Sequence, residues 1–127
     1  MSFSDKIKLD VWKKAISVQG FDSQKYRKDP CGAWMIFDEY GNHDSIYGWD
    51  IDHIYPQSLL GKNISSEIVN HIDNLRAMQW ENNNAKGDDY PVYSSIVSSD
   101  ENKNVYVDKS LTVNETIQES LKKLFNL

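Results

Sequence analysis

The sequence predicts a single α+β domain that spans residues 1–127. Three observations predict this class: the chain has the length of one ordinary domain, apolar residues recur at helical spacing near both ends, and short strand-like runs lie between them. The hydrophobic fraction of 39% and the charged fraction of 26% are typical of a globular protein with a buried core. We expect no internal repeat and no linker that would divide the chain.

The N-terminal segment predicts a helix over residues 5–18. Apolar residues such as Ile7, Val11 and Ala15 recur there at helical spacing. Gly20 is the expected end of this helix, because glycine commonly follows the last helical turn.

Two short apolar runs then predict a pair of strands. GAWMIF at 32–37 and YGWDIDHI at 47–54 have strand length, and Asp38, Gly41 and Asn42 supply turn residues between them. We therefore expect these two runs to pair as a hairpin.

A long polar connection leads to a second strand and a short helix. Within the connection, the pair Ser65-Ser66 is expected to cap one helical turn that runs to Asn70. LRAMQ at 75–79 predicts a strand, and WENNNAK at 80–86 predicts a short helix that ends at Gly87.

The C-terminal part predicts a hairpin followed by a helix. Residues 92–98 and 104–108 alternate as strands do, and the polar residues between them form the expected turn. Thr112 and Glu115 have capping-box spacing, so the helix is expected to begin near Thr112. Its apolar stripe is expected to be buried and consists of Ile117, Leu121, Leu124 and Phe125.

The cysteine content and the absence of long apolar runs narrow the class of protein. Cys31 is the only cysteine, which excludes an intrachain disulfide framework and a multi-cysteine zinc site. No apolar run approaches the roughly 20 residues of a membrane span, and the N-terminus has no signal-peptide apolar region. We expect a cytoplasmic protein with no membrane partner.

The net charge of −5 opposes general nucleic-acid affinity, because phosphate neutralisation by basic residues supplies most non-specific binding. A local basic patch is the alternative. Its candidate members are Lys25, Arg27, Lys28, Lys62, Arg76 and Lys86. We expect weak intrinsic affinity for DNA, or a protein partner that delivers the substrate.

The chemistry of the chain is concentrated between residues 47 and 88. Asp52 and His53 are adjacent at the end of a strand-like run, so both can serve one site only if the strand ends there; Pro56 supports that ending. Asn83 and Lys86 share one face of the predicted helix. A strand pair followed by a short helix can therefore bring Asp52, His53 and Asn83 around one divalent ion.

These residues match the pattern of a known family. DHIYPQS, then Asn74, then Asn83 and Lys86, resembles the HNH endonucleases, whose fold is called ββα-metal. The resemblance covers residues 31–88, and it is closest to small bacterial and phage HNH proteins and to the HNH domain of RNA-guided CRISPR effector nucleases. It implies an HNH core with an N-terminal helix before it and a C-terminal hairpin and helix after it.

The resemblance also implies a role for each matching residue. His53 corresponds to the general base that takes a proton from the attacking water. Asp52 and Asn83 correspond to the metal ligands, and Asn74 to the residue that holds the loop and orients His53. Lys86 is similar to a lysine that supports the helix or contacts a phosphate.

Four further positions carry weaker expectations. Arg76 is a candidate for substrate binding together with Lys86, and Asp50 is expected to lie behind Asp52 without being a ligand. Because three asparagines are consecutive, Asn82 and Asn84 remain alternatives to Asn83 as the ligand.

One carboxylate, one amide oxygen and phosphate oxygens form a site suited to Mg²⁺, with Mn²⁺ as the alternative. The chain lacks the paired cysteines that bind structural zinc in many HNH proteins, so we expect none. The sequence thus predicts a metal-dependent endonuclease with double-stranded DNA as its substrate. The resemblance to HNH endonucleases implies cleavage to a 5′-phosphate and a 3′-hydroxyl. A catalytically silent HNH-fold assembly subunit, or a toxin-type nuclease with an immunity partner, are the alternatives.

Overall fold

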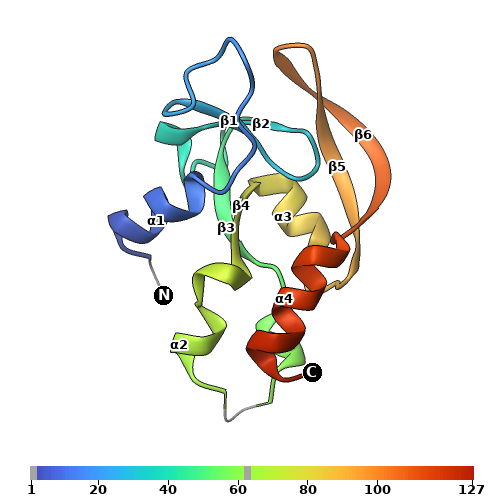
Figure 1. The fold of residues 1–127 in the computed structure, drawn as a ribbon. Coiled ribbons are helices and arrows are strands. Elements are labelled where there is room, and N and C mark those ends of the chain that lie inside the picture. The colour runs from blue at the N-terminus through green and yellow to red at the C-terminus, as the bar shows by residue number, and fades with distance from the viewer. Residues whose placement is uncertain (1–2, 62–63) are drawn as a thin grey trace.

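The computed structural model describes residues 3–61 and 64–127, and in these residues the fold is α+β (Figure 1). The α-helices are α1 (Asp5–Trp12), α2 (Ser66–Val69), α3 (Trp80–Lys86) and α4 (Glu115–Phe125). The strands are β1 (Tyr26–Lys28), β2 (Trp34–Ile36), β3 (Trp49–His53), β4 (Leu75–Gln79), β5 (Val92–Asp100) and β6 (Lys103–Thr112). Short 3₁₀ turns are η1 (Phe37–Glu39), η2 (Gln57–Leu59) and η3 (Ile72–Asn74). The strands pair as three two-stranded antiparallel sheets, β1–β2, β3–β4 and β5–β6.

The centre of the fold is the β3–β4 pair followed directly by α3. Trp49 lies opposite Gln79 and His53 lies opposite Leu75, so β3 and β4 are paired along their whole length. The predicted strand 75–79 and helix 80–86 are confirmed with the same bounds. Gly87 ends α3 with φ +52°, a backbone conformation that glycine adopts without strain.

The predicted hairpin between residues 32–37 and 47–54 is wrong. β2 pairs with β1, which lies in a polar segment, and β3 pairs with β4 instead. The physical reason is that β1, although polar in sequence, is held beside β2 by the hydrogen bonds of Arg27 and by the backbone bridge between Lys28 and Ile16. The Arg27 guanidinium donates to the carbonyls of Lys13, Ala15 and Ser23.

The helix predicted over residues 5–18 is shorter than expected. Ser4 caps α1, which ends at Trp12. Ile16 leaves the helical path and forms an isolated antiparallel bridge with Lys28. The apolar periodicity that continues past Trp12 therefore belongs to an extended segment, because its backbone has a partner in β1.

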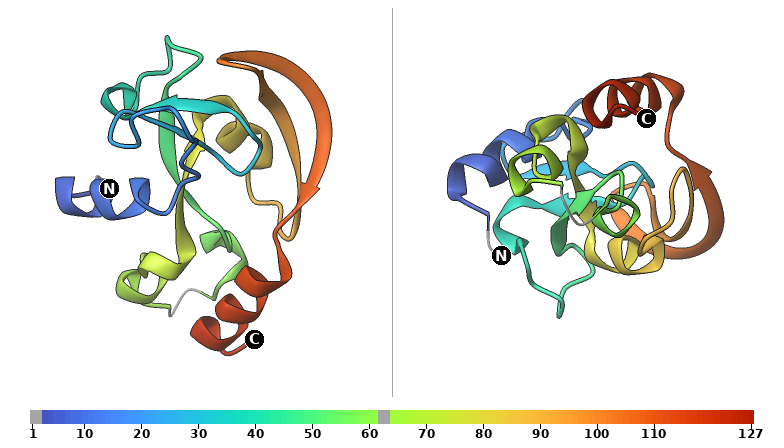
Figure 2. Two further views of the ribbon diagram at one scale, coloured as in Figure 1. Left: turned by 45° about the horizontal axis from the view of Figure 1, so that its top comes forward. Right: turned by 90° about the horizontal axis from the view of Figure 1, so that it is seen from below.

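Two apolar clusters make the core, and they involve opposite faces of the β3–β4 pair. One cluster joins α1 to Trp49 and Ile51 of β3 and to Leu75 and Ala77 of β4. The other contains Met78 of β4 and residues from β5 and α4. Figure 2 shows α1 and α4 on different sides of the central strands.

The C-terminal hairpin is confirmed and is longer than predicted. Its strands are β5 and β6, and α3 packs against β5. The helix after it begins later than predicted: Asn114 is the cap of α4, because Thr112 is still paired with Val92 in the sheet. Of the predicted apolar stripe, Leu121 is fully buried and the others pack around it.

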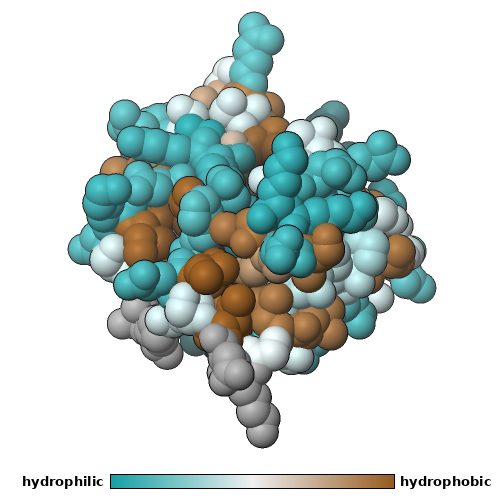
Figure 3. Space-filling view, turned by 60° about the horizontal axis from the view of Figure 1, so that its bottom comes forward, coloured by the Kyte–Doolittle hydropathy of each residue, from teal (hydrophilic) through white to brown (hydrophobic). Residues whose placement is uncertain are grey.

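The segment between β3 and β4 depends little on apolar packing. Ser65 caps α2 and Asn70 follows its last residue, as predicted. Val69 is the one buried side chain described between Gln57 and Asp73. Leu59, Ile68 and Ile72 are exposed, and Figure 3 shows apolar residues gathered on this lower face. Hydrogen bonds must therefore hold the segment in place.

Among the described residues, no helix is both long enough and apolar enough to span a bilayer.

A buried carboxylate joins the turn after β1 to the start of α3. The carboxylate of Asp29 accepts hydrogen bonds from the backbone N–H groups of Cys31, Ala33 and Gln79 and from the side-chain amide of Asn82. Burial raises the pKa of Asp29 to about 6, although these donors act in the opposite direction. The folded protein therefore holds a proton on this group at a higher pH than the unfolded chain does.

We expect the contribution of Asp29 to stability to fall as pH rises. A folded pKa of about 6, above the ordinary 3.8, gives a contribution that is complete below about pH 4 and is lost as pH passes 6. The free energy of unfolding of the wild type, relative to Asp29→Asn, should fall by about 3 kcal/mol between acid and neutral pH. Urea denaturation of both proteins over this pH range measures the two free energies of unfolding. A difference between them that does not change with pH would contradict the prediction.

Candidate functional site

Three of the residues predicted from the sequence line one cavity. Asp52 and His53 lie at the end of β3, Asn83 lies on α3, and all three border a cavity of about 380 Å³. The wall is completed mainly by polar residues of η2 and of the end of α3, namely Gln57, Ser58, Asn84 and Asp88. The ββα arrangement therefore brings together an acid, an imidazole and an amide from distant positions in the sequence.

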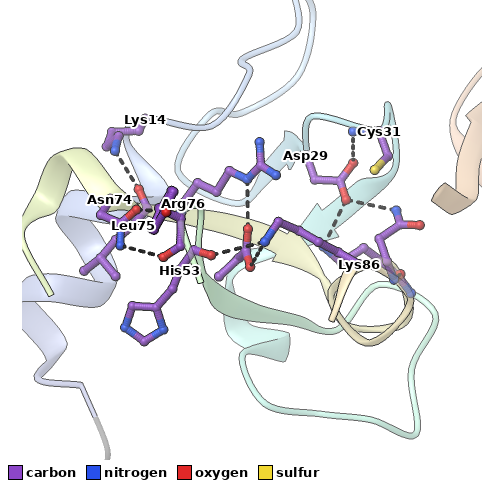
Figure 4. A network of polar contacts seen from close by, with 12 residues as sticks. Lys14, Asp29, Cys31, His53, Asn74, Leu75, Arg76 and Lys86 are labelled. Atoms are coloured by element: carbon purple, nitrogen blue, oxygen red, sulfur yellow. Dashed lines mark hydrogen bonds and ion pairs between the residues drawn. The ribbon is translucent and has the colours of Figure 1, made fainter. Parts of the chain in front are cut away.

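Asp52 is held between two buried cations, Arg76 and Lys86, both labelled in Figure 4. Its Oδ2 accepts a hydrogen bond from Arg76 Nε at 3.0 Å, and its Oδ1 lies 3.3 Å from Lys86 Nζ. Arg76 is the residue opposite Asp52 in the β3–β4 pair, and Lys86 comes from the last turn of α3. The carboxylate is thus fixed in position by β4 and α3 together.

Lys86 also fixes the end of β3. Its Nζ donates to the carbonyl oxygen of His53 at 3.2 Å, as Figure 4 shows. Burial lowers the pKa of Lys86, and the neighbouring Asp52 charge raises it in part. The side chain contacts both members of the Asp52–His53 pair, so it links α3 to the site.

The expected substrate contacts of Arg76 and Lys86 do not fit their positions. The exposed fraction of the Arg76 side chain is 9%, and that of the Lys86 side chain is 0%. Neither cation borders the cavity that contains Asp52 and His53. Their charges compensate the buried Asp52 carboxylate, which would be costly to bury alone.

The imidazole of His53 has a defined partner. Its Nε2 lies 2.6 Å from Oδ1 of Asn70, the residue that follows α2. An amide oxygen only accepts hydrogen bonds, so Nε2 is the donor, and the neutral ring then carries its lone pair on Nδ1. The Phe3 ring, 6.2 Å away between centroids, contacts the imidazole as well.

The side chain of Asn74 fixes the backbone next to His53 and next to its partner Asn70. Its Oδ1 accepts from the N–H of Tyr55, and its Nδ2 donates to the carbonyls of Tyr55 and Val69. The carbonyl of Asn74 accepts from the N–H of Ile54. These bonds fix the residues just after His53 and the residue just before Asn70. The fully buried Asn74 therefore sets the position of the imidazole and of its partner.

The structure separates the three consecutive asparagines. Asn82 is fully buried, and its side chain bonds to Asp29 and to the backbone of β5, including the N–H and carbonyl of Val97. Asn83 and Asn84 line the cavity instead. Asn82 is thus excluded as a ligand at this cavity, and the alternatives narrow to Asn83 and Asn84.

Asp50 lies on the same face of β3 as Asp52 but makes a different contact. Its Oδ2 lies 2.8 Å from Nε2 of His43, and the His43 ring stacks on Trp80 at the start of α3. Neither Asp50 nor His43 borders the cavity. The contact between Asp50 and His43 connects β3 to the loop before it. Of the two aspartates, Asp52 is the one that borders the cavity.

The residues of the candidate basic patch are not gathered at the cavity. Arg27 is bound to backbone carbonyls, and Lys28 lies over the ring of Trp34. No lysine or arginine among the described residues borders the cavity. Lys62 lies outside the described residues.

The oxygen donors at the cavity fit a hard divalent ion. A carboxylate has about four lone-pair sites, so Asp52 retains acceptor capacity beyond its bonds to Arg76 and Lys86. Within residues 3–61 and 64–127, no three His, Cys, Asp or Glu side chains come together as a metal-binding group. One carboxylate and one amide would leave several positions to water, which is how Mg²⁺ is usually bound.

Several residues of the site were not predicted from the sequence. Asn70 was expected only as the end of a helical turn, and Gln57, Ser58 and Asp88 carried no expectation. Polar residues near a turn give no periodic signal, and only the folded chain brings them to the cavity.

The chain matches no protein-family model, and comparisons with curated proteins and with solved structures gave no match.

Proposed function

We propose that this protein is a metal-dependent DNA endonuclease of the HNH type. The observation that carries the proposal is the cavity of about 380 Å³ that Asp52, His53 and Asn83 border together. The order of the motif residues along the chain, and the strand pair followed by a short helix, support the same assignment. Double-stranded DNA is the proposed substrate.

His53 acts as the general base in this proposal. With Nε2 donating to Asn70, the lone pair on Nδ1 is available to accept a proton from the attacking water. Asn74 and Lys86 keep the imidazole in place through the backbone around it.

Asp52 and Asn83 are the proposed ligands of a single Mg²⁺ or Mn²⁺ ion. Arg76 and Lys86 already hold the Asp52 carboxylate in a fixed orientation, so the carboxylate would need little rearrangement when the metal ion binds. When bound, the ion supplies Lewis-acid polarisation of the phosphate and charge stabilisation for the leaving oxygen.

The net negative charge of the chain and the lack of a described basic side chain in the cavity wall suggest how the substrate is obtained. With a net charge of −5 and no basic side chain described at the cavity, the intrinsic affinity for DNA is proposed to be weak. A protein partner that brings DNA to the site would compensate for this weak affinity.

Removal of divalent metal should abolish cleavage. We expect supercoiled plasmid to be nicked or linearised with Mg²⁺ or Mn²⁺, to remain intact in EDTA, and to be cut again when Mg²⁺ is restored in excess. Gel analysis of plasmid forms measures this. Because no zinc site is expected, the far-ultraviolet circular dichroism should not change in EDTA.

Two outcomes would decide against the proposal. Cleavage that is unaffected by EDTA would exclude the metal-dependent reaction. A complete lack of cleavage with every divalent ion, in a folded protein that binds a partner, would favour an assembly subunit.

A further inference from the structure

A second cavity lies apart from the proposed nuclease site. It measures about 610 Å³ and is bordered by the segment that follows α1, by β4, by the end of β6 and by α4. Its apolar wall includes Ile54, Ala77, Leu111, Val113 and Ile117. No residue borders both cavities, and the volume is within the range of small-molecule sites, about 300–1,000 Å³.

Arg76 gives this apolar cavity a buried cation. The side chain borders the cavity and is nine-tenths buried. Its Nε donates to Asp52, and its Cζ lies 5.1 Å from the centre of the Tyr93 ring, which also borders the cavity. Its Nη2 is buried without a hydrogen-bond partner among the described residues. A buried guanidinium N–H without an acceptor is costly, so an anionic acceptor supplied by a ligand would be favoured there.

Other groups at this cavity add positive potential. Lys14 borders it, and its Nζ donates to the carbonyls of Ile72 and Leu75. The first turn of α4 also borders it, where the helix carries partial positive charge, and Asp73 is the one acidic side chain described in the wall. The excess of positive groups over this single carboxylate favours an anion.

We propose that the second cavity binds a small organic anion. An apolar body would lie against the aliphatic wall, and a carboxylate, sulfonate or phosphate group would accept a hydrogen bond from Arg76. Because Nη2 is covered in this structure, binding requires a movement of the Arg76 side chain at the cavity wall.

The charge requirement is tested with two probes of one shape. 8-Anilinonaphthalene-1-sulfonate has an aromatic body and a sulfonate, whereas N-phenyl-1-naphthylamine has the same body without the charge. We expect the sulfonate to bind the folded protein at one site, about tenfold or more tightly than the neutral probe, as one charge-assisted hydrogen bond requires. Fluorescence titration measures both affinities. Equal affinities, or no saturable binding of the sulfonate, would overturn the proposal.

The location is tested with a pair of charge variants. Thr116 is exposed in the first turn of α4 and borders the cavity, so Thr116→Glu adds a negative charge at a position where an acid stabilises a helix. We expect it to weaken sulfonate binding about three- to tenfold and to leave neutral-probe binding unchanged. Ser66→Glu places the same charge in the first turn of α2, away from the cavity, and should change neither. Equal effects of the two variants would place the sulfonate elsewhere and refute the assignment.

Discussion

Replacing His53 with alanine should lower the rate of plasmid cleavage by about 10²- to 10⁴-fold, the usual contribution of a general base. The imidazole borders the site cavity, and its hydrogen bond to Asn70 leaves one ring nitrogen free to accept a proton. The side chain is only half-buried and makes this single hydrogen bond, so the fold should be kept. Initial rates of nicking at saturating Mg²⁺ measure the loss.

His43→Ala is the matched control for this variant. His43 is also a histidine bonded to one polar partner, Asp50, but it lies outside the site cavity. We expect its cleavage rate to stay within about twofold of the wild type, because its contacts with Asp50 and Trp80 lie outside the cavity and it has no role in the proposed reaction. Similar rates for His53→Ala and His43→Ala would remove His53 from the mechanism.

Replacing Asn82 with alanine should lower the free energy of unfolding by about 3–5 kcal/mol, at the upper end for a single substitution. The fully buried amide donates to Asp29 and to the Val97 carbonyl, and it accepts from the N–H groups of Ile96 and Val97. Alanine would leave these buried groups without partners. Urea denaturation followed by circular dichroism measures the change.

Asn84 offers the comparison within the same helix. It is exposed and borders the site cavity, so Asn84→Ala should change the free energy of unfolding by less than about 1 kcal/mol. If the two variants were equally stable, Asn82 would not be the residue that fixes α3 to β5, and the exclusion of Asn82 as a ligand would lose its support.

Elements with local signals were predicted well from the sequence. Ser65 before α2, and Gly87 after α3, act on their own neighbours, so these boundaries could be located without knowledge of the fold. Strand pairing could not be located in the same way. The partner of β2 is a polar strand whose Arg27 satisfies nearby carbonyls, and neither fact produces a periodic pattern.

In the site too, features with a local sequence signal could be predicted, and features that depend on the folded chain could not. The spacing of Asp52, His53 and Asn83 was enough to predict that they would come together, because a strand end and a helix face have fixed geometry. The roles of Arg76 and Lys86 could not be predicted in this way. A lysine or an arginine is normally a surface residue. Here both are buried, and their positive charges compensate the negative charge of the buried Asp52 carboxylate.

The hydrogen bonds of Asn82 also limit how the protein can be shortened. This residue lies inside the 31–88 motif, yet its amide binds Asp29 and β5, which both lie outside it. A fragment trimmed to the motif would lose the hairpin that covers α3 and the carboxylate that holds its first turn. Residues 31–88 are therefore not an autonomous folding unit, and transferring them to another protein would require Asp29 and the β5–β6 hairpin as well.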